Sequence, residues 1–265
     1  MEFCRKERKR PKFRLSFLFL FTIASFAVCF TLYMRDDSYI ITGLSANSSE
    51  EPAVYANLSV DSAKRVINPV VRSEPRGKEY FDTALFIGNA DLKGLAEYSL
   101  VPPDRVIAQN GLKFDNLDSF MTSYKGEVTT IPALVESISP EALYLLIGSQ
   151  EAYEFSESVF TAHYQEFIDN IKEQNPGTAI YLISLFPIPA DSETQERTNA
   201  KINSFNSAAL SFANRNGIYY LDVNTELTGN DGKLPSSMSE DSEMSALTRE
   251  AYEIIADYIL SHVSE

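Results

Sequence analysis

Residues 81–95 read FDTALFIGNADLKGL and carry the clearest indication of the fold of this chain. Residues 83–87 form an apolar run of strand length, and the turn residues Gly-Asn-Ala-Asp follow directly at 88–91. An apolar run that ends in turn residues is typical of a strand buried on both faces of a parallel sheet. Because ligands of such sheets bind beyond the carboxyl ends of the strands, residues 88–91 are predicted to lie at the functional edge of an α/β domain.

The same pattern returns four times along the chain. Further apolar runs of strand length lie at residues 105–108, 142–147, 179–185 and 218–223. Residues 156–174, 193–214 and 248–262 have helical spacing instead. The side chains expected on the inner helix faces are Phe160, Tyr164, Phe167, Ile168, Ile171, Tyr252, Ile255, Ile259 and Leu260. Five strands alternating with helices predict a three-layer, doubly wound, mostly parallel five-stranded sheet.

The first 34 residues predict a membrane anchor. Residues 1–14 contain seven Lys or Arg and two Glu, whereas residues 15–34 carry no charge. Twenty apolar residues at about 1.5 Å each cover the roughly 30 Å hydrocarbon core, and the basic flank is expected to remain cytoplasmic. We therefore expect residues 15–34 to be one transmembrane signal anchor in the lipid bilayer of the cell membrane, with the C-terminal domain extracytoplasmic.

A cleaved signal peptide is the alternative interpretation of this segment. Its apolar region is normally about 7 to 15 residues and ends at small residues. Here the span runs into the charged residues 35–37, although an Ala-x-Ser-like site at 46–48 leaves cleavage open. Both cysteines, Cys4 and Cys29, precede residue 35, so the outer part has no thiol for a disulfide or a metal site.

The remaining chain divides into a linker and one domain. Residues 35–79 are rich in Ser, Asp, Glu, Asn and Pro and show no periodicity, which is typical of an extended linker. Residues 80–265 are predicted to form a single domain. The chain has 37 acidic against 23 basic residues, and seven of the basic ones lie in the tail. Such an acidic outer domain argues against a nucleic-acid partner.

Three strand ends and two framework segments carry a resemblance to a known family. The strand ends are GNAD at 88–91, QNG at 109–111 and GSQE at 148–151, and the framework segments are NAKINSFN at 199–206 and LTREAY at 247–252. In this order and spacing they resemble the GDSL-type, or SGNH, hydrolases. The resemblance implies a flavodoxin-like fold and ester hydrolysis by Ser, His and Asp, with an oxyanion hole of backbone amides and an Asn side chain.

Carried over position by position, the resemblance implies an altered site. Asn89 stands where the family has the Asp before its nucleophile, and Ala90 stands at the position of the nucleophilic Ser. Gly111 matches the family Gly, whose amide can still point at an oxyanion. Gln150 replaces the family Asn and is one methylene longer.

The late family motif lacks its imidazole. Aligning LTREAY with the family places Glu243 at the acid position and Ala246 at the base position, and starting from Asp241 places Met244 at the base position instead. The chain has two histidines, and both are expected to be ordinary surface or near-surface residues: His163 in the middle of a helix and His262 far along the last one.

These replacements predict a pseudoenzyme that acts as a binding or scaffold module at the cell envelope. The expected partner is an acylated envelope glycan or a protein, and no cofactor or metal is expected. The alternative is an active ester hydrolase, an acyl or O-acetyl esterase on envelope glycans or lipids, with a rewired site at Ser149 or at the acids Asp91, Glu151 and Glu243. For Asp91 and Glu151 we favour a capping role. A third interpretation is that the domain is an inert structural anchor.

Overall fold

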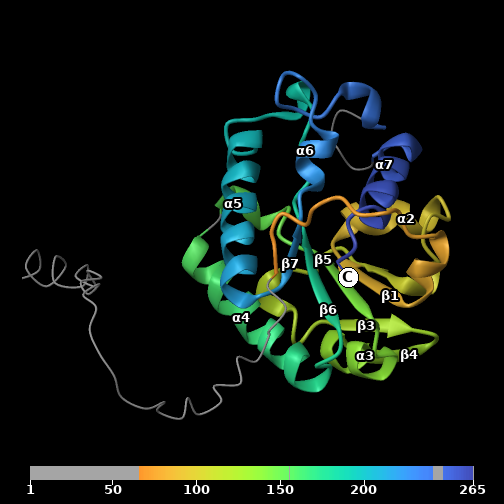
Figure 1. Cartoon of the computed structure of the whole chain (residues 1–265). Helices are drawn as coiled ribbons and strands as arrows, with labels where there is room; N and C mark the ends of the chain where they lie inside the picture. The colour runs from red at the N-terminus through yellow and green to blue at the C-terminus, as the bar shows by residue number, and fades with distance from the viewer. Residues whose placement is uncertain (1–65, 155, 241–246, 265) are drawn as a thin grey trace, which may run out of the picture. The chain divides into compact units, whose positions relative to one another are not determined.

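The computed structural model describes residues 66–154, 156–240 and 247–264 (Figure 1). The predicted anchor at 15–34 and the predicted site residues Glu243 and Ala246 lie outside these ranges. Within them, no helix is both long enough and apolar enough to cross a membrane.

A five-stranded parallel sheet forms the centre of the domain. Its strands are β1 (Ala84–Gly88), β2 (Val106–Ala108), β5 (Ala142–Leu146), β6 (Ala179–Ile183) and β7 (Tyr219–Leu221). Neighbouring strands run parallel in the order β2-β1-β5-β6-β7. Every residue of β1 and β5 is buried, as expected for strands covered on both faces. All five predicted strands are confirmed, each with bounds shifted by one or two residues.

Helices cover both faces of the sheet. They are α2 (Lys93–Glu97), α3 (Ile131–Ile138), α4 (Glu157–Gln174), α5 (Asn199–Asn216), α6 (Val223–Leu227) and α7 (Arg249–Leu260). Figure 1 shows α4 and α5 on one side of the sheet and α2 and α7 on the other. The predicted inner side chains of α4 and α7 are all buried, so the three-layer arrangement and both helix faces are confirmed.

Several short elements were not predicted. A two-stranded antiparallel hairpin, β3 (Met121–Tyr124) and β4 (Glu127–Thr130), follows β2. The 3-10 helices are η1 (Lys78–Asp82), η2 (Ala90–Leu92), η3 (Pro103–Arg105), η4 (Phe114–Asn116), η5 (Glu151–Glu154), η6 (Ala190–Ser192) and η7 (Ser236–Met238). Because these elements span three to five residues, they are too short to show a hydrophobic period.

Helix α5 begins later than the residue 193 predicted from its spacing. Thr198 is its N-cap, and the Thr198 side chain accepts a hydrogen bond from the Lys201 amide at 3.2 Å. The Glu193 carboxylate accepts from the Asn199 amide at 2.9 Å, so it reaches the helix start from outside the helix. Side chains that bond to nearby amides in this way compete with helical hydrogen bonds.

The end of the predicted linker is packed against the domain. The Val70 amide donates to the Tyr220 carbonyl at 2.9 Å, and the Asn68 side chain accepts from the Tyr220 amide at 2.7 Å. The Arg76 amide donates to the Leu260 carbonyl at 2.9 Å. Residues 66–79 therefore follow the edge of β7 and the end of α7. Their polar composition did not predict this packing.

Two buried asparagines of α5 fix the chain that leaves β6. Asn206 accepts from the Leu185 amide at 2.8 Å and donates to the Leu185 carbonyl at 3.0 Å. Asn199 makes the same pair of bonds with Ile188, both at 2.9 Å. An amide side chain offers one donor group and one acceptor, so each Asn replaces a neighbouring strand for one residue. We call this arrangement the asparagine clamp of residues 185–188.

We expect Asn206→Leu to lower the free energy of unfolding by about 1–3 kcal/mol. Leucine has a similar size but leaves the buried Leu185 amide without its acceptor. The exposed Ser204 of the same helix supplies the control, and Ser204→Ala is expected to change stability by less than about 0.5 kcal/mol. Urea unfolding followed by circular dichroism measures both. Equal midpoints for the two variants would show that the clamp does not stabilise the fold.

Candidate functional site

A cavity of about 530 Å³ lies beyond the carboxyl ends of the central strands. Ala90 and Asp91 line it after β1, Ser149 and Gln150 after β5, and Phe186 after β6. We call this cavity the strand-end cleft. Its position is the one at which doubly wound sheets bind ligands.

The structure brings some of the predicted site residues together. Ala90 and Gln150 both line the cleft. Asn89 is buried beside it, where its side chain accepts from the Asp91 amide at 3.3 Å and donates to the Ser149 hydroxyl. Gly111 is not part of the lining. The amides of Ala90 and Gly111 donate no hydrogen bond within the described part of the chain.

Gly148 makes the turn that presents Ser149 and Gln150. Its φ of +115° lies in a region that side-chain-bearing residues rarely adopt. A Cβ atom there would also overlap the ring of Phe205 from α5. The glycine at this strand end therefore has a structural role, and it positions two residues of the cleft.

Asp91 does not have the capping role that was predicted for it. The N-cap of η2 is Asn89, whose side chain accepts from the Asp91 amide at 3.3 Å, and the carboxyl group of Asp91 interacts with Ser149 and Asn89 instead. Burial raises the pKa of Asp91 above its ordinary value, against the lowering effects of the Ser149 hydrogen bond and the nearby charge of Arg197. The cleft thus contains a buried carboxyl group beside a hydroxyl.

Glu151 follows its predicted role. Its carboxylate accepts from the Phe114 amide at 3.2 Å, at the start of η4. Burial raises the pKa of Glu151, although two backbone hydrogen bonds oppose the shift. Glu151 does not line the cleft, so only Asp91 among the described acids predicted here does so.

Two cations of the cleft were not predicted. Arg197 donates from Nε to the Tyr153 hydroxyl at 3.0 Å, and its guanidinium lies 5.6 Å from the Tyr153 ring centre. Lys93 donates to the Asn110 side chain at 3.4 Å. The chain has a formal charge of −14, so a cleft lined by two cations differs from the acidic composition of the chain as a whole. They favour a ligand that carries an anionic or strongly polar group.

Neither histidine contributes to the cleft. His163 lies on α4 with its ring centre 6.1 Å from that of Phe114. His262 follows α7, where it stacks on Tyr258 at 3.8 Å and bonds through Nδ1 to the Tyr258 carbonyl at 2.7 Å. Both are partly exposed, as predicted. The described residues also contain no group of three His, Cys, Asp or Glu that could hold a metal ion.

The parallel sheet and its strand-end cleft define an α/β domain of the doubly wound class, with a ligand site at the carboxyl edge of the sheet. The model of the GDSL-like Lipase/Acylhydrolase family matches residues 100–253, more than half of the chain. The chain therefore belongs to this family, and the resemblance inferred from its strand ends is confirmed.

Solved structures share the fold at low sequence identity. A Streptococcus pneumoniae protein described as a platelet activating factor aligns with a TM-score of 0.51 and 17% identity, over 68% of this chain and 87% of that one. A Bacteroides fragilis protein assigned as an acylhydrolase gives 0.51 and 14%, over 78% and 96%. A Desulfitobacterium hafniense protein assigned to the G-D-S-L lipolytic family gives 0.50 and 16%, over 68% and 98%. The comparison with curated proteins gave no match.

We expect Asp91→Asn to stabilise the fold at pH 8 and to lose this advantage as the pH falls below about 4. A raised pKa means that the folded state binds the proton more tightly than the unfolded state. Ionisation of Asp91 therefore costs stability as the pH rises, and at low pH both states are protonated. Urea unfolding at several pH values measures the difference. Asp82→Asn on the exposed side of η1 is the control, and a wild type more stable than Asp91→Asn at pH 8 would contradict the assignment.

Proposed function

We propose that this protein is a single-pass membrane protein whose extracytoplasmic GDSL-like domain binds a ligand at the cell envelope and does not hydrolyse it by the Ser-His-Asp chemistry of the family. The observation that carries the proposal is Ala90 in the lining of the strand-end cleft. Its methyl group stands where the family resemblance places the attacking hydroxyl, and it cannot attack an ester carbonyl.

The groups around Ala90 support this proposal. The side chain of Asn89 is engaged by Ser149 and by the Asp91 amide. Neither described histidine lies in the cleft, so none of the described residues there supplies an imidazole base. The two registers of the late motif also place no histidine at the base position, since they point to Ala246 or Met244.

The remaining cleft is suited to binding an acylated envelope glycan. Leu185, Phe186 and Ile188 give it an apolar wall for an acyl group, and Lys93 and Arg197 provide positive charge. Ala90 lines the cleft with an unbonded amide, which matches a family position that holds an acyl oxygen. A protein that presents a similar group is the other partner consistent with this lining.

We expect the protein to bind O-acetylated envelope polysaccharide more tightly than the same polysaccharide after chemical deacetylation. The acyl group then contacts the apolar wall and the free amide of Ala90. Ala90→Trp fills the cleft and is expected to abolish the difference, whereas Ser204→Trp on the exposed side of α5 is expected to preserve it. Saturation binding measures both polysaccharides with each variant. Equal binding of the two forms by the wild type would exclude recognition of the acyl group.

A second candidate function is ester hydrolysis through a rewired site. The observation that favours it is that Ser149 and Asp91 line the same cleft, and that burial raises the pKa of Asp91. Asp91 could accept the proton of the Ser149 hydroxyl as that oxygen attacks an ester carbonyl. However, Asn89 also donates to the Ser149 oxygen, which occupies one of its lone pairs and lowers its nucleophilicity.

Turnover of short-chain aryl acetates separates the two functions. We expect no turnover above background from the natural protein, and turnover from a variant that combines Asn89→Asp, Ala90→Ser, Gln150→Asn, Glu243→Asp and Ala246→His. That variant restores the family residues on the same scaffold. Substantial turnover by the natural protein that Ser149→Ala removes would establish the rewired hydrolase instead. A residual rate needs the comparison with Ser149→Ala, because binding groups alone can accelerate hydrolysis about 10³-fold.

A further inference from the structure

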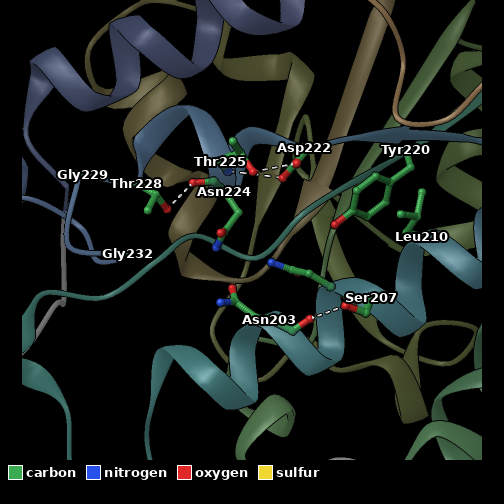
Figure 2. A pocket seen from close by; sticks show the side chains of 11 residues that line it. Asn203, Ser207, Leu210, Tyr220, Asp222, Asn224, Thr225, Thr228, Gly229 and Gly232 are labelled. Carbon is green, nitrogen blue, oxygen red and sulfur yellow. Dashed lines mark hydrogen bonds between the residues drawn. The ribbon is translucent and has the colours of Figure 1, made fainter.

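A second cavity, also of about 530 Å³, lies between α5, β7 and α6 (Figure 2). Asn203 and Ser207 line it from α5, and Asn224 and Thr225 line it from α6. Figure 2 shows these two groups of side chains on opposite sides of the hollow. Its volume falls in the range of about 300–1,000 Å³ that small-molecule sites occupy. We call it the amide cavity.

The lining of the amide cavity is polar but almost uncharged. It consists mainly of side-chain amides, hydroxyls and glycines, and it contains no Lys or Arg. Asp222 is its one carboxylate, and that group caps α6 by accepting from the Thr225 amide at 3.2 Å and the Thr225 hydroxyl at 2.7 Å. Burial raises the pKa of Tyr220 far above neutrality, so its phenol stays uncharged. In this respect the cavity differs from the strand-end cleft with its two cations.

Several polar groups of the cavity remain available to a ligand. The side-chain amide of Asn203 makes no hydrogen bond among the described residues. Asn224 donates to the Leu185 carbonyl at 2.8 Å, but its side-chain oxygen receives no donor in the described part of the chain. The cavity thus offers an unused donor, two unused acceptors and the apolar surface of Leu210.

We infer that the amide cavity binds uncharged sugar residues of a glycan. Each sugar hydroxyl is both a donor and an acceptor, so it pairs with amides and hydroxyls that are both as well. The C–H face of a sugar ring packs on apolar carbon such as that of Leu210. A fully apolar ligand would leave the amides without partners, and an anionic ligand would find no cation here.

This site is independent of the function proposed for the cleft. Residues 185–188 separate the two cavities, because Leu185 lines the cleft while its backbone is bonded by Asn206 and Asn224 of the amide cavity. A sugar can therefore bind in the amide cavity whether or not the cleft binds an acyl group or hydrolyses an ester.

Titration of the full chain with maltotriose and with tri-N-acetylchitotriose tests the inference. The protein is kept in a detergent without a sugar headgroup, because a glycosidic detergent would compete for the site. We expect at least one oligosaccharide to bind saturably by calorimetry. Ser207→Trp, which fills the cavity from an exposed helix position, and Asn203→Ala, which removes the unused amide, are each expected to weaken binding at least about tenfold.

Two controls make the result specific. Ser204→Trp lies on the same helix outside the cavity and is expected to leave the affinity unchanged, and Ala90→Trp blocks the cleft alone. Loss of sugar binding in Ala90→Trp but not in Ser207→Trp would place the sugar in the cleft and overturn the inference. Absence of binding to both oligosaccharides, or equal weakening by Ser204→Trp and Ser207→Trp, would also overturn it.

Discussion

The arrangement of both cavities depends on the asparagine clamp. Residues 185–188 leave β6 without a neighbouring strand, so their buried backbone groups need other partners. Asn199 and Asn206 supply them from α5, seven residues apart and therefore on the same side of the helix. This fixes the distance of α5 from the sheet edge. Leu185 and Ile188 of this short segment line the cleft. The Leu185 carbonyl also accepts hydrogen bonds from Asn206 and Asn224, which line the amide cavity.

Within the cleft, the polar groups at the strand ends satisfy one another. Asn89, Ser149 and Asp91 form one connected set of hydrogen bonds beside Ala90. In a site of low polarity, a connected network holds its members in place, whereas a group without a partner is costly. The site is thus a preorganised surface, and a hydroxyl in the network is less free to react than an isolated nucleophile. This arrangement supports a binding role for the cleft rather than a catalytic one.

The sequence predicted those parts of the fold that rest on long apolar periods. The five strands and the buried faces of α4 and α7 have this signal, and the strand ends at 88–91 and 148–151 placed Ala90 and Gln150 in one cleft. Arg197 and the packed residues 66–79 were missed because their positions depend on irregular segments and on partners far away in the chain. Lys93 was missed because the five-residue helix α2 that it begins is too short to show a hydrophobic period. The start of α5 was missed because side chains that bond to nearby amides override helical spacing.

The two cavities differ in charge, so a single ligand that occupies both has to match the chemistry of each. The cleft combines an apolar wall with cations, and the amide cavity combines neutral donors and acceptors. A glycan that carries an acyl group and neutral sugars presents both chemistries along one chain. Once one part is bound, the other is held at a high effective concentration, so two weak contacts can give one strong interaction. Recognition of this kind needs no bond to be broken, and for that purpose a methyl group at Ala90 serves as well as a hydroxyl.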